Sequence, residues 1–216
     1  MLQDRGVDEL PTHLAARTRV IYQSSPDIAR LPSPARTFEV LVIGHLRTEK
    51  DPFRAALATA YLPEHSQIQV THLGSALSEE MAETAELAQH KLPRWHWAGA
   101  VPHKTVLKRL ARARLMVISS VMEGGANVIC EALAADVPVL ASYMPGNVGM
   151  LGEDYPGYCP VGDERRLARL LSMAETDPDF SASLLNHARQ RRGLMRPEQE
   201  ASRLRQAVAE FEQGPG

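Results

Sequence analysis

The sequence predicts an α/β protein with an open, mostly parallel sheet that is covered by helices on both faces. Three observations lead to this fold class. Short apolar runs, most of which end at glycine or serine, alternate with segments of helical periodicity. The run at 115–118 lacks polar–apolar alternation, so we expect a strand that is buried on both sides. Residues typical of helix N-termini also precede several of the helical segments, among them Ser78 and Asp163.

Composition narrows the class of protein. The chain has 216 residues, 44% of them apolar, and a net charge of −2 with its Lys and Arg residues spread along it. This argues against bulk nucleic-acid binding. No apolar run approaches 18 residues and no signal-peptide pattern is present, so we expect a cytoplasmic protein without a membrane span. Cys130 and Cys159 fit no metal or redox spacing, and we expect both to be reduced and packed as small apolar groups.

The expected elements follow in order. Residues 1–35 are interpreted as connection, with a short helix over 7–17 broken by Pro11, a short strand over 20–22 and a Pro/Ser-rich linker over 24–34. A helix with Asp51 as N-cap and Pro52 in its first turn should run over 52–61. The other expected helices cover 78–90, 103–113, a stretch from about 126, and segments that start near 163, 177 and 196. The expected strands cover 39–43, 68–73, 95–98, 115–118, 138–141 and 158–161.

Residues 115–152 are the centre of the functional prediction. They contain a buried strand, Ser119 and Ser120, a turn over 123–125 and then a helix that carries Glu131. A glycine turn before a helix favours an anion such as a diphosphate, although a plain tight turn remains the alternative. Glu123 and Glu131 can border one cleft and accept hydrogen bonds from vicinal sugar hydroxyls. Alternatively, Glu123 complements the helix dipole and Glu131 lies on an exposed helix face.

The loop after the first strand adds positive charge. Arg47 and Lys50 stand there, and a lysine in such a loop suits phosphate oxygens, with a solvated loop cation as the alternative. The histidines show no metal-binding spacing, so no metal site is expected, and Asp163 is interpreted only as a helix cap. These residues predict a site for a phosphorylated, hydroxyl-rich ligand and specify no reaction.

Two stretches carry a family resemblance. Residues 123–133 (EGGANVICEAL), with 136–142 (DVPVLAS), resemble the E-x7-E signature of GT-B glycosyltransferases of the family 4 type. Residues 44–50 (GHLRTEK) resemble the diphosphate-binding loop of that family. The resemblance covers about residues 36–212 and implies the C-terminal, Rossmann-like half of a GT-B fold, which binds the nucleotide sugar.

The resemblance also assigns roles to single residues. It implies that Lys50 holds the diphosphate, that Glu131 takes the ribose hydroxyls and that Glu123 takes the hydroxyls of the donor sugar. By the same resemblance, the amides around Gly124, Gly125 and Asn127 support the phosphates, and the backbone near Val101 meets the uracil edge. Two positions depart from the family pattern: His45 stands where arginine is usual, with Arg47 as a substitute charge, and Ala126 replaces a glycine.

A narrower resemblance involves three strings, GHLRTEKDP (44–52), MEGGAN (122–127) and PGNVGMLGEDYPG (145–157). They are similar to the selenosugar synthases of selenoneine biosynthesis, to which His45 would then belong. This similarity implies transfer of a sugar from a UDP-sugar, typically UDP-N-acetylglucosamine, to selenophosphate without a metal or other cofactor. UDP would leave against Lys50 and Arg47, and His45 with the Gly146–Asn147 loop would contact the acceptor.

The resemblance further implies a division of the chain. Residues 1–35 would be a linker and the remnant of an N-terminal domain, 36–195 the nucleotide-sugar-binding domain, and 196–216 a crossover helix and tail. Leu204, Val208 and Phe211 form an apolar stripe that would need the N-terminal domain as its partner. We therefore expect this chain alone to bind nucleotide sugars with little transfer. The alternatives are a family 4 enzyme with a hydroxyl acceptor and a non-catalytic nucleotide-sugar-binding module.

Overall fold

The computed structural model describes residues 1–8 and 10–212 of the chain, so the tail expected over 213–216 lies outside the described residues. Within the described part, six parallel strands form one sheet in the order β3-β2-β1-β4-β5-β6. Their bounds are β1 Phe38–Ile43, β2 Ile68–Leu73, β3 Trp95–Trp97, β4 Leu115–Ile118, β5 Val139–Ser142 and β6 Tyr158–Cys159. All six predicted strands are thus present, with ends shifted by at most two residues.

The strand order reverses between β1 and β4. From β1 the chain builds outward through β2 to β3, then returns to place β4 on the other side of β1, with Val40 opposite Leu115. The connections on the two sides of this point lead in opposite directions, which opens a crevice at the carboxyl ends of β1 and β4. The stretches that follow these two strands are the ones with the predicted chemistry.

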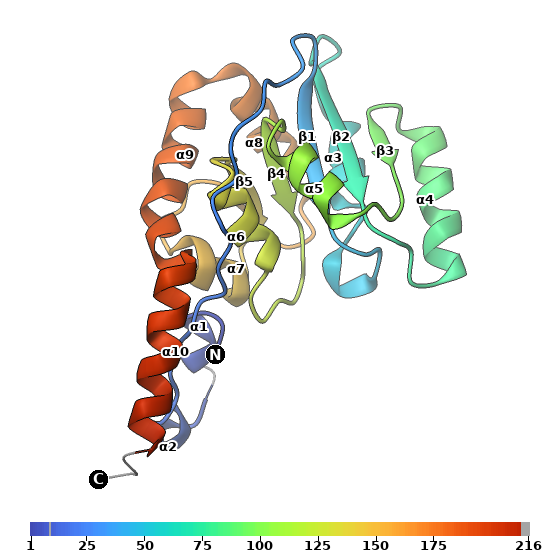
Figure 1. Ribbon diagram of the computed structural model, residues 1–216. Helices are drawn as coiled ribbons and strands as arrows, with labels where there is room; N and C mark the ends of the chain where they lie inside the picture. Colours follow the sequence, from blue (N-terminus) through green and yellow to red (C-terminus); the bar gives the residue numbers. More distant parts are fainter. Residues whose placement is uncertain (9, 213–216) are drawn as a thin grey trace.

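Helices cover both faces of the sheet, as the sequence predicts (Figure 1). On one face lie α5 and α6, and on the other α3 packs against α8. The predicted caps at Ser78, Asp163 and Asp177 are confirmed, because each side chain accepts a hydrogen bond from a first-turn amide of its helix. The helical elements are α1 Arg5–Asp8, α2 Thr12–Ala15, η1 Thr48–Lys50, α3 Arg54–Thr59, α4 Glu79–Lys91, α5 His103–Leu110, α6 Asn127–Ala134, α7 Pro145–Leu151, α8 Glu164–Thr176, α9 Pro178–Arg192, η2 Gly193–Met195 and α10 Pro197–Glu212.

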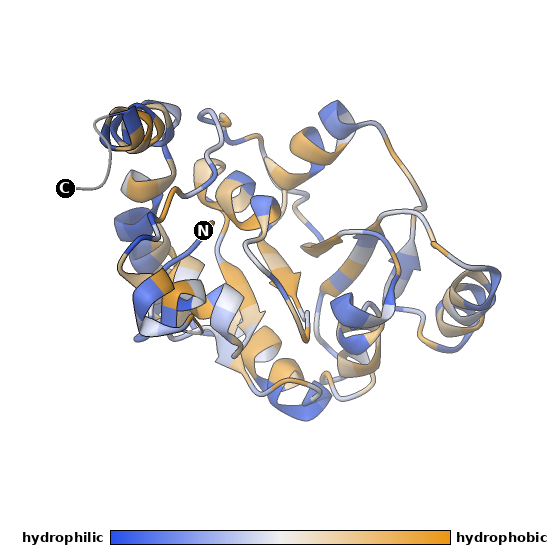
Figure 2. Cartoon of the chain, turned by 90° about the horizontal axis from the view of Figure 1, so that it is seen from below, coloured by the Kyte–Doolittle hydropathy of each residue, from blue (hydrophilic) through white to orange (hydrophobic). Residues whose placement is uncertain are grey.

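The core lies between the sheet and its helices. Every residue of β4 and β5 is buried, which agrees with the continuous apolar runs in the sequence. Figure 2 shows these central strands in hydrophobic colours, whereas the outer helices alternate between hydrophobic and hydrophilic. Cys130 and Cys159 are free and buried in this core. Burial raises the pKa of Cys130 to about 12 and that of Cys159 to about 11, so neither thiol is a nucleophile at neutral pH.

Three local predictions are wrong. Residues 20–22 form no strand, because this extended segment has no ladder partner; instead Tyr22 is buried and its hydroxyl donates to Gly149 O. Asp51 is not a helix N-cap: it has a φ of 44° at the end of η1, and α3 begins only at Arg54, whose side chain pairs with it. The expected Gly146–Asn147 loop is the first turn of α7, which Pro145 begins.

The two ends of the described chain lie together. Figure 1 shows α10 extending past the sheet beside α1 and α2, and an Arg19–Glu210 ion pair of 2.7 Å links the two segments. The predicted apolar stripe of α10 is exposed, with Phe211 at 87% of its full accessible area. The three-part division of the chain, and an N-terminal domain as the partner of this stripe, stay predictions.

Candidate functional site

The site lies where the loops after β1 and β4 meet. The Ser119 hydroxyl donates to Asp51 O at 2.9 Å, and the Val121 amide donates to Glu49 O at 2.9 Å. These bonds hold η1, which ends at Lys50, against the start of the β4–α6 loop. The two loops are about 70 residues apart in the sequence, and they meet because β1 and β4 are neighbours in the sheet.

Lys50 and Glu123 form an ion pair at this junction. The Lys50 side chain is 21% exposed and that of Glu123 only 9%, so the pair faces a partly enclosed crevice. The Ser120 hydroxyl donates a second hydrogen bond to the same carboxylate oxygen, Oε1, at 2.8 Å. The ammonium group and the carboxylate therefore stand side by side, where a ligand with both phosphate and hydroxyl groups could engage each of them.

The glycine turn is closely packed at Gly125, whereas a Cβ at Gly124 would meet no atom within 4 Å. Gly125 has a φ of 159°, and a Cβ at this position would lie 2.7 Å from Leu2 Cβ. On the other side, Gly146 of α7 approaches the backbone of Glu123 so closely that a Cβ would lie 2.1 Å from Glu123 O. Gly125 thus lies against the N-terminal segment and Glu123 against α7, and no local sequence pattern predicts either contact.

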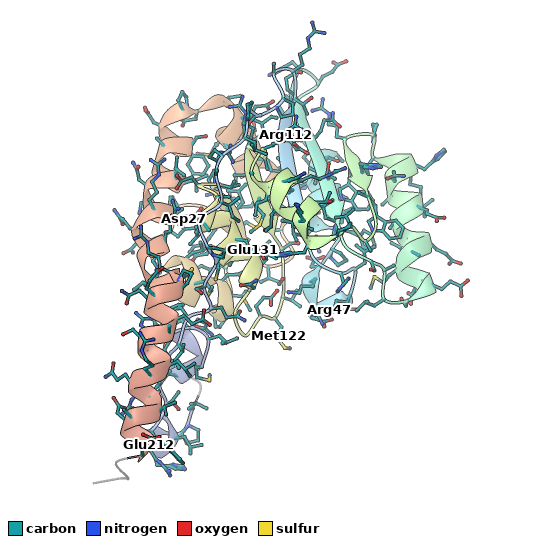
Figure 3. All side chains as sticks on the ribbon, in the orientation of Figure 1. Asp27, Arg47, Arg112, Met122, Glu131 and Glu212 are labelled. Atoms are coloured by element: carbon teal, nitrogen blue, oxygen red, sulfur yellow. The ribbon has the colours of Figure 1, made fainter. Side chains whose placement is uncertain are left out.

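Glu131 is buried, with 5% of its area exposed, so the alternative of an exposed helix face is wrong. Its Oε1 accepts hydrogen bonds from Asn127 Nδ2 at 3.2 Å and from His103 Nε2 at 2.8 Å. Asn127 lies one helical turn before Glu131, so this contact follows from the i, i+4 spacing. His103 is the first residue of α5, and its role was missed by the sequence analysis. Figure 3 shows Glu131 at the centre of the molecule, behind the edge that carries Arg47 and Met122.

His72 lies beneath the site and was also missed. It is buried in β2, and its Nε2 is 2.9 Å from Gly44 O. Burial lowers the pKa of His72, so we expect a neutral imidazole that donates this hydrogen bond and fixes the turn after β1. His72 lines a small cavity together with His45, Lys50, Ser119 and Ser120. No sequence pattern marks His72, because Gln69 and Thr71 in the same strand are polar as well.

The remaining predicted residues differ in how they are placed. Arg47 is exposed and its Nε pairs with Glu49 at 3.2 Å, so the structure does not bring its charge to the Lys50–Glu123 pair. His45 is exposed at the crevice, and its Nδ1 accepts from the Ser75 amide at 3.2 Å. Val101 lies two residues before His103, the residue that bonds Glu131. Asn147 is fully buried, and its amide donates to Ser142 O and Ser142 Oγ, both at 3.0 Å.

Two searches of the described residues bear on the predicted partners. They contain no group of three or more His, Cys, Asp or Glu side chains arranged to hold a metal ion. None of the helices described is both long and apolar enough to cross a membrane.

The sequence was compared with protein families. Residues 24–191 match the family described as glycosyl transferases group 1, and this match covers the whole sheet. The chain belongs to this family. The glycosyltransferase family that the sequence resemblance implies is therefore confirmed at the level of group 1. The match spans both loops of the site, those after β1 and β4.

Among curated proteins, this group 1 glycosyltransferase chain is similar to the "glycosyltransferase 1 domain-containing protein 1" of Xenopus tropicalis. The two are 22% identical over 151 residues, which is 69% of this chain and 43% of the relative. Among solved structures, Anabaena HepE has been determined with UDP and with UDP-glucose. It is 20% identical to this chain at a TM-score of 0.77, and the match covers 92% of this chain and 58% of HepE.

Sucrose-phosphate synthase from Thermosynechococcus elongatus is another structural relative. It is 22% identical at a TM-score of 0.76, with 92% of this chain and 53% of that protein covered. These likenesses confirm the predicted Rossmann-like open sheet and its GT-B type. The chain spans only about half the length of the relatives that it matches.

Proposed function

We propose that this chain provides the donor side of a glycosyltransferase and binds a UDP-sugar at the edge formed by β1 and β4. One observation carries the proposal: Lys50 and Glu123 pair where the loops after β1 and β4 meet, and the buried Glu131 lies on α6, the helix that follows the second loop. A cation for the diphosphate and two carboxylates for hydroxyl groups are the groups that a nucleotide sugar requires.

The proposed roles follow from these positions. Lys50 contacts the diphosphate and stabilises the charge that develops on UDP as the glycosidic bond opens. Glu123 accepts hydrogen bonds from the donor sugar, and Glu131 accepts them from the ribose. The amides of Gly124, Gly125 and Asn127 support the phosphates, and the backbone at Val101 meets the uracil. The reaction would need no metal ion or cofactor beyond the UDP-sugar substrate. Arg47 could contribute only if its side chain leaves Glu49.

For the substrates, we propose UDP-N-acetylglucosamine as donor and selenophosphate as acceptor, on the strength of the three strings at 44–52, 122–127 and 145–157. In this reaction a bond forms between selenium and the anomeric carbon, while the bond from that carbon to the UDP oxygen breaks and UDP takes the electron pair. His45 is the proposed acceptor contact. Its Nδ1 is already an acceptor for Ser75, so Nε2 carries the proton and can donate to an anion. The buried Asn147 amide is already used, which weakens the case for Gly146–Asn147.

The test has a binding stage and a transfer stage. Calorimetric titration with UDP and UDP-N-acetylglucosamine should detect binding by the 216-residue chain. Lys50→Met should lower the affinity for both ligands by about tenfold or more, because a charge-assisted hydrogen bond is lost. UDP release is then measured with and without selenophosphate. Lys91→Met, which removes an exposed ammonium group from the end of α4, is the matched control and should leave binding unchanged.

The outcomes separate the alternatives. UDP release that depends on selenophosphate supports the acceptor, whereas release with a hydroxyl acceptor alone favours an ordinary family 4 enzyme. Binding without any transfer, also when an N-terminal GT-B domain is supplied, favours a nucleotide-sugar-binding module. If neither UDP nor the UDP-sugar binds, the donor-site proposal is wrong.

A further inference from the structure

The buried Glu131 carboxylate is held on one side only. Both hydrogen bonds that it receives, from His103 and from Asn127, end on Oε1. Within residues 1–8 and 10–212, the second oxygen, Oε2, makes no hydrogen bond with the protein. An ionised carboxylate offers acceptor sites on both oxygens, so one side of Glu131 is satisfied and the other is available to a ligand.

The two residues that hold Oε1 differ in origin and exposure. Asn127 lies on the same helix as Glu131, whereas His103 reaches it from the start of α5. The His103 side chain is 68% exposed, so it stands at the mouth of the site above a carboxylate that is nearly buried. Because a carboxylate only accepts hydrogen bonds, the His103 Nε2 that faces it must carry the proton.

We propose that His103 is a positioning residue for nucleotide recognition: it fixes the Glu131 carboxylate so that Oε2 is presented to the ribose hydroxyls. This inference rests on the proposed UDP-sugar site and names a determinant of its specificity. The imidazole orients the carboxylate before the ligand arrives, which avoids the loss of side-chain freedom on binding. His103 thereby favours a ribonucleotide over a deoxyribonucleotide.

The geometry also predicts the effect of removing the His103 imidazole. In His103→Ala, Oε1 keeps the Asn127 bond, and the carboxylate can turn toward solvent through the opening left at the mouth of the site. Contacts to the diphosphate at Lys50 lie elsewhere on the edge and stay intact. The substitution should therefore weaken only the ribose contact. A ligand that lacks the hydroxyl bound to Oε2 should bind the variant and the unsubstituted chain with the same affinity.

The experiment compares UDP with 2′-deoxy-UDP and 3′-deoxy-UDP by calorimetric titration of the 216-residue chain. We expect His103→Ala to weaken UDP by about fivefold and to change the affinity of at least one deoxy analogue by less than twofold. The insensitive analogue then identifies the hydroxyl that contacts Oε2. His103→Gln, whose amide can donate in place of Nε2, should restore most of the UDP affinity. His96→Ala, which removes an exposed imidazole from β3, is the matched control and should change nothing.

Two results would overturn the inference while the UDP-sugar site stands. One is UDP binding that does not change in His103→Ala. The other is an equal loss for UDP and for both deoxy analogues, because this would place the effect outside the ribose contact. Failure of the unsubstituted chain to bind UDP would instead remove the proposed function and this inference together. Thermal unfolding of each variant, unchanged relative to the control, excludes misfolding as the cause of a loss.

Discussion

The Lys50–Glu123 ion pair predicts that one substitution, Glu123→Gln, changes the affinities for UDP and for UDP-N-acetylglucosamine in different ways. In the structure Lys50 contacts Glu123, so a diphosphate has to compete with this carboxylate for the ammonium group. Glu123→Gln removes the competing charge and keeps the size of the side chain. UDP, which lacks the donor sugar, should then bind as tightly as before or more tightly. UDP-N-acetylglucosamine should lose the carboxylate proposed to hold its hydroxyl groups.

The magnitudes follow from exposure and charge. Because Lys50 is partly exposed, its net pairing energy is about 1 kcal/mol at most, so the gain for UDP should not exceed about fivefold. Replacing a charged acceptor by a neutral one at the sugar should cost about 1.5 kcal/mol, or roughly tenfold. Both ligands carry the diphosphate, so the gain at Lys50 cancels in their affinity ratio, which should change by roughly tenfold against the sugar nucleotide.

Calorimetric titrations of both ligands at low and high salt measure this ratio. Any gain for UDP should shrink at high salt, because screening weakens the competition between charges at a partly exposed site. Glu86→Gln, which removes an exposed carboxylate from α4, is the control. An equal loss of affinity for UDP and for UDP-N-acetylglucosamine would refute the reasoning, because Glu123 would then support the loop and not the sugar.

Two further predictions concern the core. Tyr155→Phe should lower the free energy of unfolding, measured in urea titrations, by about 1–3 kcal/mol. The Tyr155 hydroxyl bonds both the amide and the carbonyl of Val139 in buried β5, and its loss leaves these two groups unsatisfied. A change below about 0.5 kcal/mol would mean that water replaces the hydroxyl. Burial raises the pKa of Cys130 to about 12 and that of Cys159 to about 11. Both thiols should therefore resist iodoacetamide at pH 8 in the folded chain and react with it in urea. Rapid labelling of the native protein would contradict their burial.

Local patterns in the sequence determined the fold class. The apolar run at 115–118 coincides with β4, because a strand buried on both faces must be apolar along its whole length. Ser78 and Asp177 mark helix starts because their side chains bond amides two or three residues further along the chain. Such signals lie within one turn or one strand, so they can be read without knowledge of the tertiary structure.

Only the tertiary structure decided which side chains meet. Lys50 and Glu123 are 73 residues apart and pair because β1 and β4 are neighbours in the sheet. His103 reaches Glu131 because α5 and α6 cover the same face, and no periodicity in the sequence encodes that contact. Conversely, Arg47 is turned toward Glu49, and residues 20–22 join no strand of the sheet. Contacts between distant residues depend on strand order and helix packing, which the whole chain sets.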